Sequence, residues 1–348
     1  MFENSDRTEL TALGEFGLID HLSQHFPNKV DSTILGIGDD AAVIKLGSKY
    51  LAISTDMMVE GVHFDLTYTP LKHLGYKAVT SNLSDICAMN GLPKQITVSL
   101  AFSNRFSLEA IEELYEGIRL ACEKYEIDLI GGDTSTSRSG LMISVTAIGE
   151  VSQKKITKRS GAKSGDLLVL SGDIGGAYMG LQILEREKRV FLEHKQMQPD
   201  LEPYDYIVGR QLKPEARLDV IKILDELEIV PTSMMDVSDG VASELHHLGK
   251  ASGVGFEVYE DKIPLDQQTL DTALSFNLNP SIAALNGGED YELLFTVDQK
   301  HYDKLKNHLD FSIIGHATES AGKYVLNTRA GNSFDIKAQG WNHLTDNQ

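Results

Sequence analysis

Six short acidic segments, far apart along the chain, limit how it can fold. In each segment Gly, Ser or Thr precedes Asp or Glu, and apolar sequence lies beside it. The six are Gly38-Asp39-Asp40, Ser54-Thr55-Asp56, Leu83-Ser84-Asp85, Gly132-Asp133, Asp236-Val237-Ser238-Asp239 and Gly288-Glu289-Asp290. A carboxylate beside a protein core is costly unless a positive charge meets it. The fold must therefore spread these acids over its surface or gather them around cations.

Any one of these segments alone is typical of an ordinary turn or helix cap, because Asp commonly follows Gly or Ser there. Six of them, at expected strand ends and helix starts, favour convergence instead. Two carboxylates about 4 Å apart repel by roughly 4 kcal/mol at an effective dielectric constant near 20. Converging acids would therefore be protonated or would bind divalent cations. Ligation by oxygen alone suits Mg²⁺, and no His or Cys grouping has the spacing of a zinc site.

Two glycine-rich segments could suggest a nucleotide-binding loop of a known kind. Residues 36–41 fit a degenerate dinucleotide pattern, but a strand-like segment follows where that pattern requires a helix. The segment "SGAKSGD" contains a Lys-Ser pair without the spacing of a P-loop. A nucleoside triphosphate would thus be held mainly through metal, with Arg159 as a candidate phosphate contact.

Charge and composition exclude several classes of partner. The 348 residues include 51 Asp and Glu against 32 Lys and Arg, a formal net charge of −19. Such a field repels nucleic acid and anionic membranes and attracts cations. No secretory signal is visible, and no apolar segment approaches the roughly 20 residues of a membrane span. We therefore expect a cytoplasmic protein without nucleic-acid or membrane partners, whose Cys87 and Cys122 are buried free thiols.

Strand-like and helix-like segments alternate throughout the chain. A buried strand is expected at residues 50–55, and helical spacing covers residues 70–91 and 107–126, with Ser107 as an N-cap. We expect "GGD" at 131–133 to lie between strands, and "MMDVSDG" to be a loop leading into a helix that ends at Gly253. The polar residues 152–166 predict a boundary between domains 1–151 and 152–348. The segment lengths favour an α/β protein of the α+β type, with mixed or antiparallel sheets.

The ordered motifs of the chain resemble those of the thiamine-monophosphate kinase family. The matching segments, from about Leu13 to His343, are "LGEFGLID", "GIGDDAAVI", "ISTDMMVEGVHF", "YKAVTSNLSDICAMNGLP", "LIGGDTS", "RSGAKSGD", "MDVSDG", "NGGEDYELLFTV" and "QGWNH". The resemblance implies a two-domain fold like that of aminoimidazole-ribonucleotide synthetase. It implies an N-terminal ATP- and Mg-binding domain whose mixed or antiparallel sheet pairs across a homodimer. A C-terminal α/β domain would complete the active site.

The same resemblance implies ATP-dependent phosphorylation of thiamine monophosphate to thiamine diphosphate, by in-line transfer of the γ-phosphoryl group with several Mg²⁺ ions. No general base is implied, because the acceptor is already an anion. The implied metal ligands are Asp40, Ser54, Thr55, Asp56, Asp85, Asp133, Asp236 and Asp239. The implied ATP contacts are Tyr115, Gly132, Asp133, Arg159 and Ser238. The implied substrate contacts are His63, Glu289 and Trp341. One departure is Gln211, where the family commonly has His.

Three alternatives differ in what they predict. Another ATP-using enzyme of the same superfamily is disfavoured, because a selenophosphate-type enzyme is expected to have a reactive N-terminal Cys and a hydrogenase maturation factor a C-terminal Cys. The two cysteines here are Cys87 and Cys122. A non-catalytic metal or nucleotide sensor would carry the same acids without turnover. A hydrolase built on a carboxylate pair would stay active in EDTA.

Overall fold

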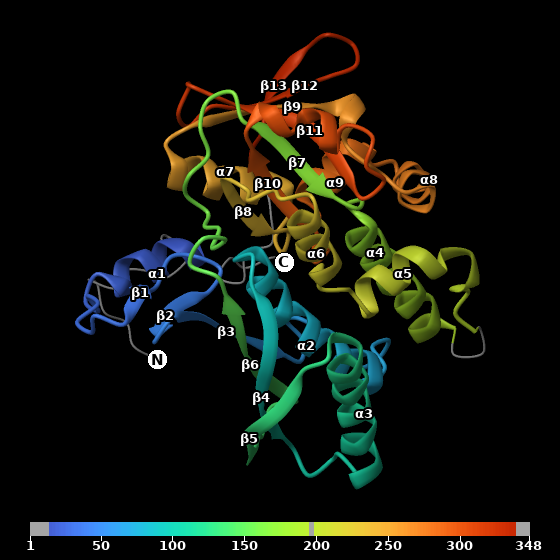
Figure 1. Ribbon diagram of the computed structural model, residues 1–348. Helices are drawn as coiled ribbons and strands as arrows, with labels where there is room; N and C mark the ends of the chain where they lie inside the picture. The colour runs from blue at the N-terminus through green and yellow to red at the C-terminus, as the bar shows by residue number, and fades with distance from the viewer. Residues whose placement is uncertain (1–13, 195–197, 339–348) are drawn as a thin grey trace, which may run out of the picture.

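The computed structural model describes residues 14–194 and 198–338 of the chain. Two β-sheets, each covered by helices, make up the molecule (Figure 1). Both sheets are mixed and mostly antiparallel, which confirms the expected α+β arrangement and excludes a doubly wound parallel sheet. Within the described part of the chain, no helix has the length and apolar character needed to cross a membrane.

The N-terminal sheet has the strand order β1-β2-β3-β6-β4-β5. Its strands are β1 (Thr33–Leu35), β2 (Ala42–Leu46), β3 (Lys49–Val59), β4 (Leu92–Phe102), β5 (Asp128–Thr136) and β6 (Met142–Val151). All neighbours are antiparallel except β4 and β5. Strand β6 alternates buried and half-buried residues along its whole length, as a strand with one covered face should.

Helices α2 (Leu71–Ala88) and α3 (Leu108–Tyr125) cover one face of this sheet (Figure 1). Ser107 caps α3, because its hydroxyl accepts a hydrogen bond from the backbone N–H of Ala110, as the sequence predicts. The two helices approach closely at a pair of glycines. A Cβ on Gly75 would lie 2.0 Å from the carbonyl oxygen of Leu114, and one on Gly117 would lie 1.9 Å from that of Lys72. Only glycine permits this close packing.

The C-terminal sheet has the order β13-β12-β9-β11-β7-β10-β8. Its strands are β7 (Leu167–Ser171), β8 (Ser233–Asp236), β9 (Gly255–Tyr259), β10 (Leu293–Val297), β11 (Phe311–Thr318), β12 (Tyr324–Asn327) and β13 (Ser333–Asp335). Its helices are α4 (Gly176–Glu193), α5 (Asp205–Leu212), α6 (Leu218–Glu226), α7 (Val241–Ser252), α8 (Gln267–Ser275), α9 (Pro280–Asn286) and α10 (Tyr302–Leu305), with short 3₁₀ turns at Glu202–Tyr204, Glu260–Lys262 and Gln299–His301. Helix α7 ends at Gly253, whose φ of 70° forms the expected left-handed cap.

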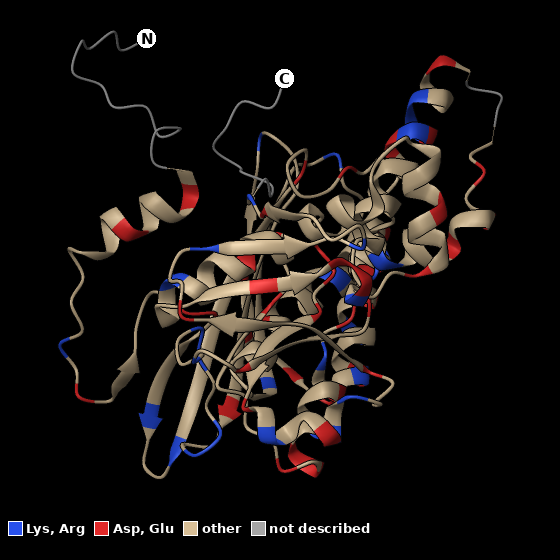
Figure 2. Ribbon diagram, turned by 90° about the horizontal axis from the view of Figure 1, so that it is seen from above, with Lys and Arg blue, Asp and Glu red and all other residues tan. Residues whose placement is uncertain are grey.

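Helix α2 joins the two halves of the molecule. It is buried over most of its length, and it packs on the N-terminal sheet, on β8, and on α5 and α6. One hydrophobic core therefore runs from the N-terminal sheet through α2 and α6 to one face of the C-terminal sheet. By contrast, α1 (Gly14–Ser23) has no buried residue and stands beside the main body (Figure 2). Its Phe16 contacts His247 of α7 with the two rings tilted and their centroids 4.1 Å apart.

Three local expectations were wrong. Residues 131–133 lie inside strand β5, not between strands, and a Cβ on Gly132 would lie 1.8 Å from the carbonyl oxygen of Val98. The glycine therefore serves close strand pairing instead of a turn. The segment at 233–236 is strand β8, paired with β10, where a loop was expected. Both cysteines are free, but Cys122 is only half-buried while Cys87 is fully buried.

Candidate active site

A cleft of about 2060 Å³ lies between the two sheets and takes its lining from both. Most of the residues singled out from the sequence line it. They are Asp40, Ser54, Thr55, Asp56, His63, Asp85, Arg159, Asp236, Ser238, Asp239 and Glu289. Tyr115, Gly132 and Asp133 are not part of this lining, and Trp341 lies outside the described residues.

Three carboxylates meet at one point of the cleft. Asp40 precedes β2, Asp85 lies in the last turn of α2 and Asp236 ends β8, so each comes from a different element. One carboxylate oxygen from each lies within 4.8 Å of the others. Segments at positions 40, 85 and 236 thus bring acids to a single point, as convergence predicts.

Serine hydroxyls and an amide orient these acids. Ser54 donates a hydrogen bond to Asp85, and Ser84 donates to the Oδ2 of Asp236 over 2.6 Å. The backbone N–H of Asp56, in the middle of β3, donates to the side-chain oxygen of Asn82 over 2.9 Å. Residues 82, 84 and 85 belong to α2, so this helix fixes acids on both sheets at once.

Burial and mutual repulsion weaken the acidity of the cluster. Burial, followed by the charges of Asp56, Asp236 and Asp40, raises the pKa of Asp85 well above its usual range. Burial and the Asp40 charge raise the pKa of Asp236 to about 7. Burial also raises the pKa of Asp40, although the neighbouring Arg159 opposes the rise. A bound cation would remove this penalty.

Arg159 is the cation that the protein itself supplies. Its guanidinium donates to the Oδ1 of Asp40 over 2.6 Å, and its backbone N–H donates to Asp39 over 3.1 Å. The second oxygen of Asp40, Oδ2, is buried and has no hydrogen-bond partner in the structure. A buried carboxylate oxygen that accepts no hydrogen bond is suited to bind a further cation.

Glu244, which the sequence reasoning missed, shapes the loop after β8. Its Oε1 accepts hydrogen bonds from the backbone N–H groups of Ser238, Asp239 and Gly240, over 3.0, 2.9 and 3.2 Å. Burial, followed by the Asp239 charge, raises its pKa well above the usual range. An acid in the first turn of a helix that follows Ser-Asp-Gly is a recognisable signal for this kind of capping.

The loop between α9 and β10 is fixed against the loop after β8. Glu289 has a φ of 65°, and its backbone N–H donates to the carbonyl oxygen of Ser238 over 2.7 Å. Tyr291, with a φ of 52°, donates from its backbone N–H to the carbonyl oxygen of Val237 over 2.9 Å. Two non-glycine residues with positive φ so close together are uncommon and cluster at functional sites.

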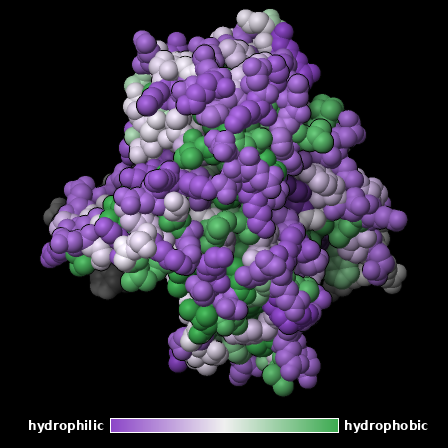
Figure 3. Space-filling model, viewed as in Figure 1, coloured by the Kyte–Doolittle hydropathy of each residue, from purple (hydrophilic) through white to green (hydrophobic). Residues whose placement is uncertain are grey.

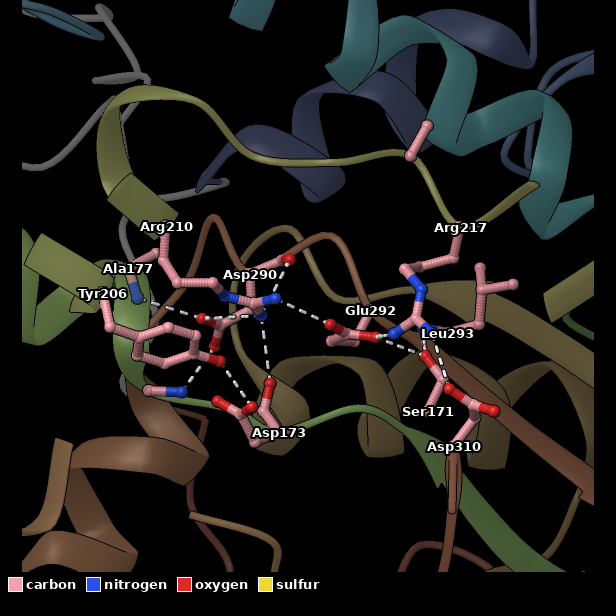
Figure 4. Close-up of polar contacts among 12 residues, drawn as sticks. Ser171, Asp173, Ala177, Tyr206, Arg210, Arg217, Asp290, Glu292, Leu293 and Asp310 are labelled. Carbon is pink, nitrogen blue, oxygen red and sulfur yellow. Dashed lines mark hydrogen bonds and ion pairs between the residues drawn. The ribbon is translucent and has the colours of Figure 1, made fainter. Parts of the chain in front are cut away.

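A buried ionic network holds the end of this loop that leads into β10 (Figure 4). Arg210 donates to the Oε1 of Glu292 over 2.8 Å and to the backbone oxygens of Asp290 and Asp173 over 3.2 and 3.0 Å. Arg217 also binds Glu292.

The carboxylate of Asp290 accepts hydrogen bonds from the backbone N–H groups of Gly175 and Ala177, over 2.6 and 3.1 Å, at the start of α4. This position at a helix N-terminus stabilises its negative charge. The loop that carries Glu289 is therefore held rigidly to the C-terminal sheet and to α4.

A second loop, residues 60–69, closes another side of the cleft. His63 accepts a hydrogen bond at Nδ1 from the backbone N–H of Val59 over 3.1 Å. Asp65 of this loop forms an ion pair with Lys188 of α4, with 2.7 Å between Oδ2 and Nζ. The ion pair links the N-terminal half of the molecule to a helix of the C-terminal half.

Three predicted ATP or metal contacts lie away from this cleft. Gly132 and Asp133 belong to β5, the edge strand of the N-terminal sheet, in which every residue is exposed. Tyr115 lies on α3, half-buried against the N-terminal core. Within one chain, the structure does not bring these residues to the acids.

Comparisons with known proteins place both halves of the chain in one family. Residues 38–151 match the family described as AIR synthase related protein, N-terminal domain, and residues 163–326 match the corresponding C-terminal domain. The chain is 35% identical over 336 residues to a thiamine-monophosphate kinase of Aquifex aeolicus, covering 96% of this chain and 99% of that protein. It is also 35% identical over 341 residues to a thiamine-monophosphate kinase of Bacillus subtilis, covering 95% and 100%.

The fold matches a solved structure of AaThiL complexed with AMPPCP and TMP. The TM-score is 0.81 at 34% identity, and the alignment covers 97% of this chain and 99% of that chain.

Proposed function

Because the chain belongs to the thiamine-monophosphate kinase family, within the AIR synthase related proteins, we infer that it transfers a phosphoryl group from ATP to thiamine monophosphate. The protein is thus a kinase of thiamine diphosphate biosynthesis, and the resemblance of its ordered motifs is confirmed. The observation that carries this function is the meeting of Asp40, Asp85 and Asp236 in a cleft built from both AIR synthase related regions.

We propose that several Mg²⁺ ions bind at this acidic cluster. The donors are all oxygens, and the buried, unpartnered Oδ2 of Asp40 fits a hard cation. The proposed ligands are Asp40, Ser54, Thr55, Asp56, Asp85, Asp133, Asp236 and Asp239. Bound Mg²⁺ neutralises negative charge on transferring phosphates.

The protein's own residues would then hold two polyanions in line. Arg159 carries a guanidinium at the acid cluster and is proposed to bind a phosphate of ATP, together with Ser238. The acceptor phosphate is an anion at neutral pH, so no residue is needed to remove a proton from it. His63, Glu289 and Trp341 are proposed to bind thiamine monophosphate; the first two line the cleft.

We propose that the protein is a homodimer paired through the N-terminal sheet. Strand β5 is an unprotected edge whose Leu129 and Ile130 are 41% and 58% exposed, and Leu92 at the start of the neighbouring β4 is 42% exposed. Figure 3 shows hydrophobic surface gathered over the lower half of the molecule, where this sheet lies in Figure 1.

Pairing of two chains along the β5 edge would assign a functional role to the exposed residues of this strand. Gly132 and Asp133 on this edge, and Tyr115 on the neighbouring α3, would reach the cleft of the partner subunit. Such pairing would account for their distance from the cleft of their own chain.

We also propose the division of the chain into domains 1–151 and 152–348. A cytoplasmic location is proposed as well, since the free thiols of Cys87 and Cys122 are stable in a reducing compartment.

The decisive experiment is an assay of the purified protein with ATP, Mg²⁺ and thiamine monophosphate, in which thiamine diphosphate is measured by chromatography. Free thiamine and aminoimidazole precursors serve as control acceptors. We expect thiamine diphosphate only with thiamine monophosphate, and none in EDTA. ATP-dependent conversion of an aminoimidazole precursor, with release of ADP, would point to another enzyme of the superfamily. Nucleotide binding without turnover would point to a sensor.

A further inference from the structure

We propose that Lys77, assisted by Gln211, is a positioning residue that orients the Glu289 carboxylate for the cationic, heteroaromatic acceptor substrate. The inference rests on the proposed function and deepens it, because it assigns acceptor recognition to a contact between the two halves of the molecule. Lys77 lies on α2 of the N-terminal half, whereas Gln211 lies in the last turn of α5 and Glu289 precedes β10 in the C-terminal half.

Lys77 is a buried cation that the acid cluster does not explain. Its exposed fraction is only 3%, which is rare for a lysine and costly unless the ammonium group is paired. Its Nζ lies 3.0 Å from the Oε1 of Glu289, and it donates to the backbone oxygen of Gln211, also over 3.0 Å. The ammonium group is thus shared between a carboxylate of the cleft and the end of α5.

The second oxygen of Glu289 is held as well. The side-chain amide of Gln211 donates to its Oε2 over 2.6 Å. With one donor on each oxygen, and its backbone N–H bonded to Ser238, Glu289 is fixed at both ends. Its side chain is nevertheless 29% exposed, and the residue lines the cleft. A rigid carboxylate that faces a cleft is what an enzyme uses to accept hydrogen bonds from a ligand and to attract its positive charge.

The direction of α2 sets where this contact lies relative to the acids. Lys77, Ser81 and Asp85 follow one another at intervals of four residues and therefore lie on one face of the helix. Eight residues of α-helix span about 12 Å. The Glu289 contact and the acid cluster are thus separated by a distance comparable with the length of an extended thiamine monophosphate. A substrate whose phosphate lies at the acids would place its aromatic, cationic end at Glu289.

A purely structural role for Lys77 makes a different prediction. If Lys77 served only to join α2 to α5, its loss would lower stability and disturb the sites of ATP and acceptor alike. If Lys77 acts through Glu289, its replacement weakens binding of the acceptor and leaves binding of ATP unchanged. The two roles are therefore separated by comparing the two substrates and by combining the variants.

The experiment compares Lys77→Met, Gln211→Met and Glu289→Gln with the wild-type protein. Lys72→Met is the matched control, since Lys72 lies on the same helix but is half exposed and pairs with Glu116 on the surface. Binding of thiamine monophosphate is measured by titration calorimetry with AMPPCP and Mg²⁺ present, and KM is measured for both substrates. We expect Lys77→Met and Gln211→Met to weaken acceptor binding by about tenfold, because each removes a hydrogen bond to a charged group. The KM for ATP should change by less than about twofold in both variants.

A double-mutant cycle gives the sharpest test. In the Glu289→Gln background, Lys77→Met should cause little further loss of acceptor affinity, because its target is already gone. Additive losses, or equal effects on acceptor and ATP, would overturn the inference. If Lys77→Met does not fold, Gln211→Met decides alone, since it keeps the backbone oxygen that Lys77 binds; unchanged acceptor binding in this variant overturns the proposal.

Calorimetry keeps this inference separate from the proposed function. A wild-type protein that binds thiamine monophosphate but forms no thiamine diphosphate would overturn the function, while the variants would still test the positioning of Glu289. A wild-type protein that turns over, with Lys77→Met behaving like Lys72→Met, would overturn only the inference. Absence of any binding of thiamine monophosphate to the wild-type protein would overturn both.

Discussion

Replacing Asp236 by Asn is expected to stabilise the protein in the absence of divalent cations, although it should abolish turnover. Asp236 is buried beside Asp40 and Asp85, and burial followed by the Asp40 charge raises its pKa from 3.8 to about 7. That difference corresponds to about 4 kcal/mol of unfavourable free energy when the carboxyl group is ionised. Asn removes the charge but keeps an oxygen that can accept the hydrogen bond from Ser84.

The pH dependence of this gain follows from the direction of the pKa shift. An acid whose pKa is raised by folding carries no penalty below its unfolded pKa of about 4, and the full penalty above about 7. Replacing the charged hydrogen bond by a neutral one costs about 1 kcal/mol. The net gain is then about 3 kcal/mol at about pH 8, and most of it is lost by about pH 5. For a protein of this size the gain corresponds to a rise of about 4 °C in Tm.

The assay is thermal unfolding followed by circular dichroism in EDTA, at about pH 8 and about pH 5. Asp271→Asn, at an exposed position on α8, serves as the control and should leave Tm unchanged. Excess Mg²⁺ should raise the Tm of the wild-type protein and raise that of Asp236→Asn much less, because a ligand stabilises only the state that binds it. If Asp236→Asn melts at or below the wild-type temperature in EDTA at the higher pH, the carboxylates do not repel one another in the folded protein. The argument for a cation at their meeting point would then fail.

Four further outcomes are expected. EDTA should remove all turnover and excess Mg²⁺ should restore it; activity that persists in EDTA would favour a metal-independent hydrolase. Asp40→Asn and Asp56→Asn should each abolish turnover with an unchanged circular dichroism spectrum, and a near-normal kcat would contradict their assignment as ligands. Arg159→Met should raise the KM for ATP about tenfold, as loss of a charged phosphate contact predicts, and an unchanged value would refute that contact. Trp341→Ala should raise the KM for thiamine monophosphate more than that for ATP, and equal effects would refute a stacking role.

Elements with a strong local pattern could be predicted from the sequence. The apolar spacing of α2 and α3, the Ser107 cap and the Gly253 end of α7 all depend on contacts within a few turns of one helix. Strand β5 could not be predicted from the sequence, because its Gly-Gly pair is also typical of a turn. Its strand conformation comes from parallel pairing with β4, and the contact between Gly132 and Val98 is made only after both strands are in place.

The candidate site, like the fold, could be predicted from the sequence only in part. The recurring acids predicted that carboxylates would converge. Repulsion between carboxylates follows from their chemistry alone and predicted that cations would meet them. The capping by Glu244 had a recognisable signal in the sequence, whereas the contacts that Lys77 and Gln211 make with Glu289 had none. Lys77 sits in a helical pattern where a lysine normally faces solvent, and its carboxylate partner lies more than 200 residues away in sequence.

The sequence by itself therefore determined the residue types of the candidate site, carboxylates and hydroxyls whose oxygens suit a hard cation, and the local elements that carry them. Only the tertiary structure decided the geometry. It brought Asp40, Asp85 and Asp236 to one point, left Asp133 on an open edge, and joined the Glu289 loop to α2. The physical reason is that side-chain type and helical periodicity are local properties. Burial, ion pairing and the pKa of each acid depend on neighbours that folding brings from distant parts of the chain.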